Sequence, residues 1–193
     1  YTTLFRSMVR EIAKADPSVA HLYGYHFLQM VTPHLCCSEH QKEHFYREST
    51  KHNWFWGNCF NPLDKRLKGV REGDTIVLNG TKSFSTGSQD ADRLLLSWIW
   101  DEESDDIGAA VIPITREGVT VHDDWDGIGQ RQTDSGTVTF HNVTVYPDEI
   151  LDRVYAGKSA FATLDAALSQ IILTNVFIGI AKGALEEAKA YTK

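Results

Sequence analysis

The hydrophobic period of this chain changes twice, and the change limits the folds open to it. Residues 1 to 52 carry apolar side chains at helical spacing, as in "TTLFRSMVREIAKA". Residues 53 to 150 instead alternate short β-branched or aromatic runs with turn clusters, and a helical period returns from 158 to 193. The sequence therefore predicts an α+β protein with N-terminal helices (1–52), a middle β domain (53–150) and a C-terminal helical part (151–193).

Cap and stop residues predict the helix ends in the first part. Asp16 followed by Pro17 is typical of an N-cap and the first helical position. We expect the helix that begins there to reach about Thr32, where Pro33 would stop it. Ser38 is expected to cap a third helix, "EHQKEHFYRESTKHN".

The middle part is expected to hold about seven or eight short strands, as a small antiparallel barrel or sandwich. Asn79-Gly80 lies between apolar residues and predicts a hairpin turn, because both central turn positions need positive φ. Residues 101 to 106, "DEESDD", are expected to form a solvated acidic turn.

The last helix is apolar on most sides, so we expect it to be buried between neighbours. Its stretch "IILTNVFIGIAKGA" is interpreted as too short to span a bilayer. The chain begins with Tyr1 and ends inside a helical pattern, so we expect it to be a piece of a longer protein.

Composition narrows the class of partner. The chain is 42% hydrophobic and 23% charged, with a net charge of -7, which argues against nucleic acid or an anionic membrane as partner. Cys36, Cys37 and Cys59 have neither CxxC nor zinc spacing, so we expect buried thiols in a reducing compartment. No secretory signal is visible, and a cytoplasmic location is expected.

The sequence contains no GxGxxG, P-loop, HExxH or GxSxG motif. His40 and His44 are one helical turn apart on a charged helix without a third ligand nearby, so we interpret them as a solvated face and predict no metal site.

"AHLYGYHF" places two polar aromatic residues on one helical face. His21 and Tyr25 are four residues apart, with Gly24 between them, and glycine costs a helix about 1 kcal/mol relative to alanine. A ligand packed against the backbone would explain that cost. A helix crossing at Gly24, with satisfied core polar groups, is the alternative that the spacing favours.

Two further stretches offer donors for a flat, polar-edged ligand. Phe84, Ser85 and Thr86 precede Gly87, a combination that suits a ligand lying against the backbone. Asn58 can both donate and accept, although a plain turn asparagine is the alternative.

In "DDWDGIGQRQTDSG" an aromatic residue is followed by several donors. Trp125 could stack on a ring, while Arg131, Thr133 and Ser135 could donate to its edge. Alone, each of these patterns is weak.

Together these stretches resemble the acyl-CoA dehydrogenase superfamily, on "NGTKSFSTG", "GIGQRQTDSGTVTFHNVTVYPDEIL" and "IGIAKGALEEAKAYT". "AHLYGYH" and "NWFWGN" bring the chain closest to its flavin-dependent monooxygenase branch, the dibenzothiophene monooxygenases. The resemblance implies an acyl-CoA dehydrogenase-like fold with N-terminal helices, a middle β-barrel or sandwich and the start of a C-terminal four-helix bundle. It covers nearly all of this chain but only about half of the family's length.

The resemblance also implies the site. Phe84 and Thr86 would contact the isoalloxazine, and Ser85 would belong to the same flavin segment with its side chain turned away. Trp125 would close over the ring. Four residues would act in catalysis, at the reactive side of the flavin or in the substrate pocket: His21, Tyr25, Asn58 and Thr86. Lys82 and Arg131 would be the local candidates for the flavin phosphate.

The activity implied is that of a two-component monooxygenase. A separate flavin reductase would supply reduced FMN, molecular oxygen would form a hydroperoxide at the flavin C4a carbon, and an organosulfur substrate would become a sulfoxide or sulfone. A homotetramer is expected. The segment after Asn58 looks shorter than the lid of dibenzothiophene monooxygenases and contains Pro62, so we expect a differently shaped substrate pocket.

Two alternatives stay open at this point. An acyl-CoA dehydrogenase would use FAD and a glutamate located beyond Lys193, although β-oxidation does not require the polar cluster of His21, Tyr25 and Asn58. A non-catalytic remnant that only mediates assembly is the other alternative.

Overall fold

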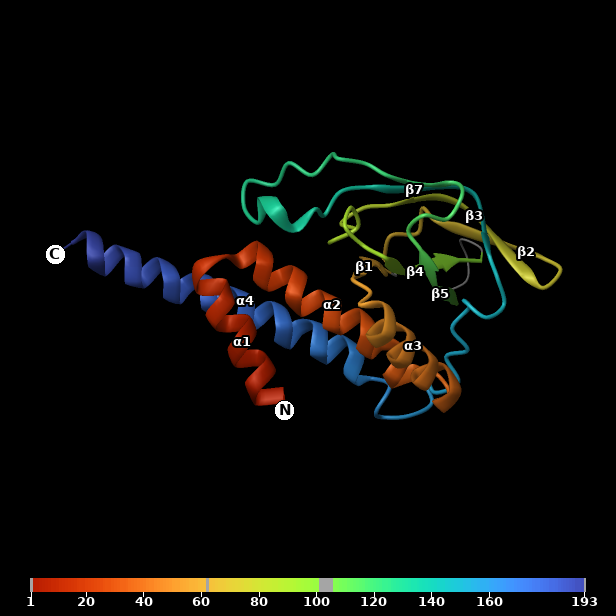
Figure 1. Ribbon diagram of the computed structural model, residues 1–193, viewed down its shortest axis with the longest axis horizontal. Helices are drawn as coiled ribbons and strands as arrows, with labels where there is room; N and C mark the ends of the chain where they lie inside the picture. Colours follow the sequence, from red (N-terminus) through yellow and green to blue (C-terminus); the bar gives the residue numbers. More distant parts are fainter. Residues whose placement is uncertain (1, 62, 101–105, 193) are drawn as a thin grey trace.

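The computed structural model describes residues 2–61, 63–100 and 106–192. The chain begins with α1 (Thr2–Ala15), α2 (Pro17–Cys36) and α3 (Glu39–His52) and ends with α4 (Leu164–Tyr191). Figure 1 shows α1, α2 and α4 side by side under the sheet, with the end of α4 reaching past the other helices. The helices and the sheet thus form two layers, as the α+β prediction requires.

The predicted start of α2 is confirmed, but its predicted stop is wrong. Asp16 Oδ1 accepts hydrogen bonds from the N–H groups of Ser18 and Val19 at 2.8 and 3.0 Å, which satisfies two free helix donors. The helix continues through Pro33 to Cys36. A proline so near the helix end removes one hydrogen bond, and the Pro33 carbonyl still accepts from the Cys37 N–H at 2.9 Å.

The middle of the chain forms one curled, mixed sheet. Its strands are β1 (Trp56–Cys59), β2 (Lys68–Glu72), β3 (Thr75–Lys82), β4 (Arg93–Ile99), β5 (Ile107–Pro113), β6 (Val119–Val121) and β7 (Val138–Val145). The order is β1-β4-β2-β3-β7-β6, with β5 on β4. Both β1 and β2 pair with β4 in parallel, so the expectation of a purely antiparallel sheet is wrong.

The hairpin predicted at Asn79-Gly80 lies elsewhere. Strand β3 runs straight through this pair with a bulge, and the turn is at Gly73-Asp74, between β2 and β3. Gly80 is required for a different reason: a Cβ there would lie 2.1 Å from the Arg66 carbonyl oxygen. The glycine of this Asn-Gly pair therefore marks a close approach of two backbone segments inside a strand, and not a turn.

Strand β4 is the centre of the β core. Every residue from Leu94 to Ile99 is buried, and Trp98 packs over Gly69 and Gly108 so closely that a Cβ at either glycine would overlap its indole. This core holds the loops at the ends of β1, β3 and β7 in place, and those loops form one side of the candidate site. Of the acidic turn predicted at 101–106, residues 101–105 lie outside the described residues.

Helix α4 is buried on one stripe, and the expectation of burial on most sides is wrong for the described residues. Ile172 and Val176 pack against α1 and α2, while Phe177 and Leu185 are 59% and 54% exposed. The helix has 28 residues and a window of mean hydropathy 1.6, so by length and composition it could cross a membrane. The prediction that this stretch is too short to span a bilayer is therefore wrong, and in the structure the helix packs against α1 and α2.

The crossing of α2 and α4 explains Gly24. A Cβ on Gly24 would lie 2.6 Å from Ile172 Cγ2 of α4, so the glycine allows the two helices to approach. The helix-crossing interpretation of Gly24 is confirmed. Its neighbours His21 and Tyr25 have another position, in the wall of a cavity.

Candidate functional site

A cavity of about 640 Å³ lies between helices α2 and α4 and the loops that leave β1, β3 and η1 (Arg131–Thr133). This volume is in the range of sites for organic ligands. The lining includes most residues singled out from the sequence: His21, Tyr25, Asn58, Phe84, Thr86, Trp125, Thr133 and Ser135. Ser85 and Arg131 are not part of the lining.

The helical wall carries the titratable groups. The rings of His21 and Tyr25 meet edge to face at 4.3 Å, one turn apart on α2. Burial lowers the pKa of His21 below its ordinary value, against an opposing hydrogen bond from Nδ1 to Gln130 Oε1. His21 is therefore neutral at pH 7, and its Nε2 is buried without a hydrogen-bond partner among the described residues.

Tyr25 is held from the other helix. Burial raises the pKa of Tyr25 above its ordinary value, while a hydrogen bond with Ser169 of α4 opposes the shift. The phenol therefore keeps its proton at neutral pH and can donate it to a bound group.

The loop wall begins with a strained residue. Phe84 has a φ of 56°, a left-handed conformation that costs a residue with a Cβ about 1–2 kcal/mol. It turns its ring toward the cavity, 64% exposed, with the ring edge-on to Trp125 at 6.0 Å. Strain of this kind is found where function fixes a side chain.

The next two residues point in different directions. Ser85 is fully buried, with its hydroxyl between the Cys59 thiol and the Lys82 carbonyl, so its side chain is turned away from the cavity. Thr86 shares a hydrogen bond of 2.9 Å with Ser135, and both side chains line the cavity.

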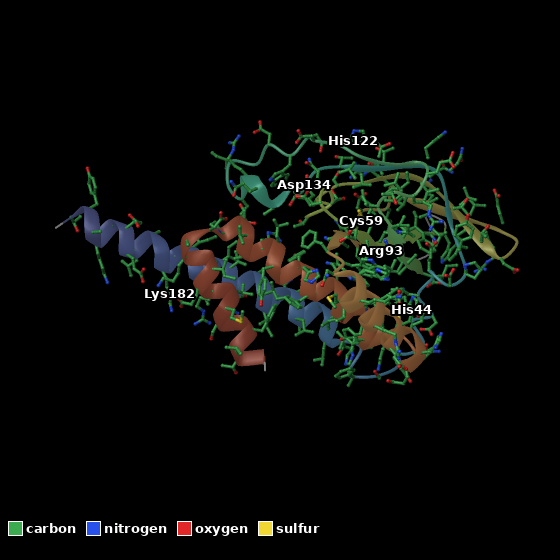
Figure 2. All side chains as sticks on the ribbon, viewed as in Figure 1. His44, Cys59, Arg93, His122, Asp134 and Lys182 are labelled. Atoms are coloured by element: carbon green, nitrogen blue, oxygen red, sulfur yellow. The ribbon has the colours of Figure 1, made fainter. Side chains whose placement is uncertain are left out.

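Residues 125 to 135 complete the loop wall. Gln130 and Asp134 flank η1 and both have left-handed backbone angles, with φ of 50° and 44°. Trp125 Nε1 donates to the Gln130 carbonyl at 3.0 Å, which fixes the indole at the cavity. Figure 2 shows Asp134 beside η1, above α2; its carboxylate accepts from the Gln89 N–H and is 3.4 Å from the Ser88 hydroxyl.

Asn58 joins the two loops. Its N–H donates to the Thr86 carbonyl at 3.0 Å, and its Oδ1 accepts from the Phe60 N–H at 2.9 Å. Asn58 lies inside β1, so the interpretation as a plain turn asparagine is wrong, and the side chain lines the cavity. Since its oxygen is engaged, the amide N–H group is the one that can donate to a ligand.

Lys82 and Arg131, the two side chains predicted as candidates for the flavin phosphate, both have partners within the protein. Lys82 is 1% exposed, and its Nζ donates to the carbonyls of Asn61 and Asp64 at 2.8 and 2.7 Å. Arg131 is exposed and forms an ion pair with Asp126 at 3.2 Å. Lys82 is therefore a structural residue under the loop, and its prediction as a phosphate ligand is wrong.

Several lining residues were not found from the sequence: Leu28, Gln29, Thr32, Phe60, Asn61, Gly129, Gln130, Asp165, Ala166, Ser169, Gln170 and Leu173. Leu28 and Thr32 follow His21 at helical spacing, so the face of α2 could have indicated them. Gln130 is 109 positions from its partner His21, and nothing local in the sequence indicates that contact.

The histidine pair of α3 lies elsewhere. Figure 2 shows His44 on α3, well away from the loop that carries Asp134, and the side chain is exposed. Within the described residues, no group of three His, Cys, Asp or Glu could hold a metal ion.

Comparison with known proteins shows which family has this architecture. Residues 65–143 match the acyl-CoA dehydrogenase middle domain. The structure of methanesulfinate monooxygenase MsuC from Pseudomonas fluorescens superimposes with a TM-score of 0.90 at 39% identity, over 97% of this chain and 48% of that chain. This chain belongs to the acyl-CoA dehydrogenase superfamily.

Several superfamily members that are about 40% identical to this chain are named monooxygenases. Dibenzothiophene monooxygenase of Rhodococcus erythropolis is 42% identical over 96% of this chain and 48% of that enzyme. The probable FMNH2-dependent monooxygenase SfnC of Pseudomonas putida is 38% identical over 96% of this chain and 47% of the relative. FMN-bound TdsC from Paenibacillus sp. A11-2 has a TM-score of 0.86 at 42% identity, over 97% of this chain and 50% of that chain. The chain thus spans about half the length of the relatives it matches.

The alignments also bear on the lid. The alignment with dibenzothiophene monooxygenase is 200 positions long. It includes 96% of this 193-residue chain, which is fewer than 200 residues, so this chain has gaps against that enzyme. The alignment with SfnC covers the same share in 186 residues and needs almost no gaps. This supports a segment shorter than in dibenzothiophene monooxygenase; its position after Asn58 stays a prediction.

The cavity fits a flavin ring better than a flavin phosphate. Phe84 and Trp125 offer aromatic faces, while Asn58 and Thr86 offer donors for a polar ring edge. The described lining includes no lysine or arginine to neutralise a phosphate. These residues could therefore hold an isoalloxazine, and the phosphate would need cations from outside the described lining.

Proposed function

We propose that the intact protein is a reduced-FMN-dependent monooxygenase that transfers one oxygen atom to an organosulfur compound. The observation that supports this most directly is the meeting of His21 and Tyr25 with Asn58, Thr86 and Trp125 in one cavity. Relatives that share the fold at about 40% identity are named monooxygenases of dibenzothiophene and methanesulfinate.

In this proposal, bound reduced FMN supplies the activation of dioxygen. The chain supplies the surroundings of the ring. Phe84 and Trp125 pack on it, the Asn58 amide and Thr86 hydroxyl donate to its edge, and apolar Leu28 and Leu173 limit the entry of water.

The helical wall handles the proton. Tyr25 keeps its phenolic proton at neutral pH, because burial raises its pKa, and neutral His21 can accept a proton at Nε2. A sulfur substrate needs no nucleophile from the protein, so a neutral donor and acceptor at the cavity are sufficient for the chain's part in the reaction.

Three further parts of the proposal follow the resemblance. A separate flavin reductase supplies the reduced cofactor, and the protein works as a homotetramer. The exposed apolar stripe of α4, with Phe177 and Leu185, is compatible with further helices or subunits packing there. Three buried free thiols support a reducing, cytoplasmic location.

A reductase-coupled assay tests the proposal. The intact protein would receive FMN, dioxygen and a panel of thioethers and alkyl sulfinates, with products read by mass spectrometry. We expect a gain of one oxygen atom on a sulfur compound that depends on the reductase. Reduction of a bound flavin by an acyl-CoA, with no oxygen transfer, would instead make the protein a dehydrogenase.

A further inference from the structure

Gln130 contacts residues on both walls of the cavity. Its side-chain Oε1 accepts the hydrogen bond from His21 Nδ1, and its carbonyl accepts from Trp125 Nε1 at 3.0 Å and Thr133 Oγ1 at 2.9 Å. One residue thus connects the imidazole of the helical wall with the indole of the loop wall.

The backbone shows that this position is held against its own preference. Gln130 has a φ of 50°, in the left-handed region that costs a side chain with a Cβ about 1–2 kcal/mol. Glycines on both sides of Ile128 would make it easy for the loop to take another course, so the conformation is maintained by its contacts. Such strain is typical of residues that position a functional group.

We propose that Gln130 is a positioning residue that fixes the neutral tautomer of His21, with the proton on Nδ1 and the lone pair on Nε2. An amide oxygen can only accept, so Nδ1 must carry the proton in this hydrogen bond. Nε2, buried without a partner in the described part of the chain, is then the atom that accepts a proton from a bound group. The inference rests on the proposed monooxygenase function for its catalytic meaning, but the tautomer itself is a property of the resting protein.

The groups around His21 leave this amide as the deciding contact. Tyr25 touches the ring from the same helix, and its phenol is neutral at pH 7. Asp165 of α4 lines the same cavity, where its carboxyl accepts a hydrogen bond of 2.8 Å from Thr32. On the loop side, the charged neighbours Arg131 and Asp126 pair with each other at exposed positions.

Nitrogen NMR of the intact protein labelled at histidine tests the inference without any activity. In the wild type, we expect His21 to show a protonated Nδ1 and an unprotonated Nε2. Gln130→Leu removes the acceptor and keeps a side chain that is not branched at Cβ, so the backbone cost is unchanged, and the proton should move to Nε2. Gln130→Glu keeps an acceptor, so it should retain the wild-type tautomer and raise the pKa of His21 by about one unit or more.

Gln132→Leu is the matched control, because Gln132 is exposed on η1 two residues away. It should leave the NMR pattern of His21 and the turnover unchanged. In the oxygenation assay, Gln130→Leu should lower kcat at least about tenfold, part of the 10²–10⁴-fold that a positioned acid or base provides, with little change in KM. The acidic limb of the pH profile should move to higher pH in Gln130→Glu.

A protonated Nε2 in the wild type, or an unchanged tautomer in Gln130→Leu, would overturn the inference. The tautomer could change as expected while neither the wild type nor any variant transfers oxygen. In that case Gln130 still positions His21, and it is the proposed function that fails.

Discussion

On its α2 side, the cavity is lined by regular helix, whereas on its loop side three lining or flanking residues have left-handed backbone angles: Phe84, Gln130 and Asp134. The helical wall presents the groups that can move a proton, His21 and Tyr25. The loop wall presents aromatic faces and small hydroxyls held by hydrogen bonds to one another. Under the proposed function, the loop wall would hold the flat flavin ring and the helical wall would carry the acid–base chemistry.

The two walls also differ in what stabilises them. Helical backbone satisfies its own hydrogen bonds, so α2 can present His21 without strain. The loop wall depends on specific contacts, such as the Asn58 N–H to the Thr86 carbonyl and the buried chain of hydroxyls from Thr86 through Ser135 to Thr133. Changes on the helical wall should therefore alter rate, while changes on the loop wall should alter binding and stability together.

The largest effect is expected on the helical wall. Either His21→Ala or Tyr25→Phe should lower oxygen transfer by about 10²–10⁴-fold while the protein stays folded, because a positioned proton donor or acceptor is lost. Steady-state rates and thermal unfolding would be measured together. Tyr23→Phe is the control, since Tyr23 is not in the described lining and its hydroxyl donates to Met8 Sδ at 3.9 Å. Wild-type turnover in both variants would show that these two side chains are only part of the core.

On the loop wall, Thr86→Val should weaken FMN binding about tenfold and destabilise the protein by about 1–3 kcal/mol. The substitution keeps the shape but leaves the buried Ser135 hydroxyl with one partner fewer. Titration calorimetry and denaturant unfolding measure the two effects. Thr86→Ser keeps the hydroxyl and should stay within about twofold of wild type in affinity. A larger loss in Thr86→Ser than in Thr86→Val would mean that the methyl group, and not the hydrogen bond, matters.

The pH dependence should come from the helical wall. Burial lowers the pKa of His21 below 6.5, so its neutral form is the one favoured by folding. Its contribution to stability is complete above 6.5 and is lost as the pH falls through the lower folded pKa. Oxygen transfer should therefore be flat through 6.5 and fall only at more acidic pH. A half-maximal rate above that value would contradict the buried, neutral histidine.

The smallest effect concerns strain in the loop wall. Phe84→Gly should be about 1 kcal/mol more stable than Phe84→Leu, because only glycine takes a φ of 56° without the left-handed cost. The entropy of glycine in the unfolded chain reduces the gain. Both variants remove the ring, and residue 84 is 64% exposed, so their difference in denaturant midpoint comes chiefly from the backbone. A less stable glycine variant would show that this backbone is not strained.

A similar contrast, between local and distant contacts, explains which parts of the structure could be predicted from the sequence. Local signals predicted α1, the Asp16 cap and most strands, because periodicity and capping act over a few residues. The motifs His21/Tyr25 and Phe84–Thr86 were recognisable for the same reason, and all of these residues except Ser85 line the cavity. The division at 52 and 150 stays a prediction.

What failed depended on distant contacts. Gly80 is set by the approach of Arg66, the parallel pairing of β1 depends on β4, and Lys82 is enclosed by the carbonyls of a separate loop. Gln130 and His21 are in contact although 109 positions, including most of the β domain, separate them in the sequence. Such contacts are properties of the folded arrangement, and no local pattern carries them.

The account is tested most directly by following the source of the oxygen atom. The intact protein would react with isotopically labelled dioxygen, reductase-supplied FMN and an organosulfur substrate, beside His21→Ala and Tyr23→Phe. We expect the label in the sulfoxide or sulfone formed by wild type and Tyr23→Phe, and almost no labelled product from His21→Ala. Product oxygen that comes from water, or equal labelling by all three proteins, would contradict the claim that this cavity is the site of oxygen transfer.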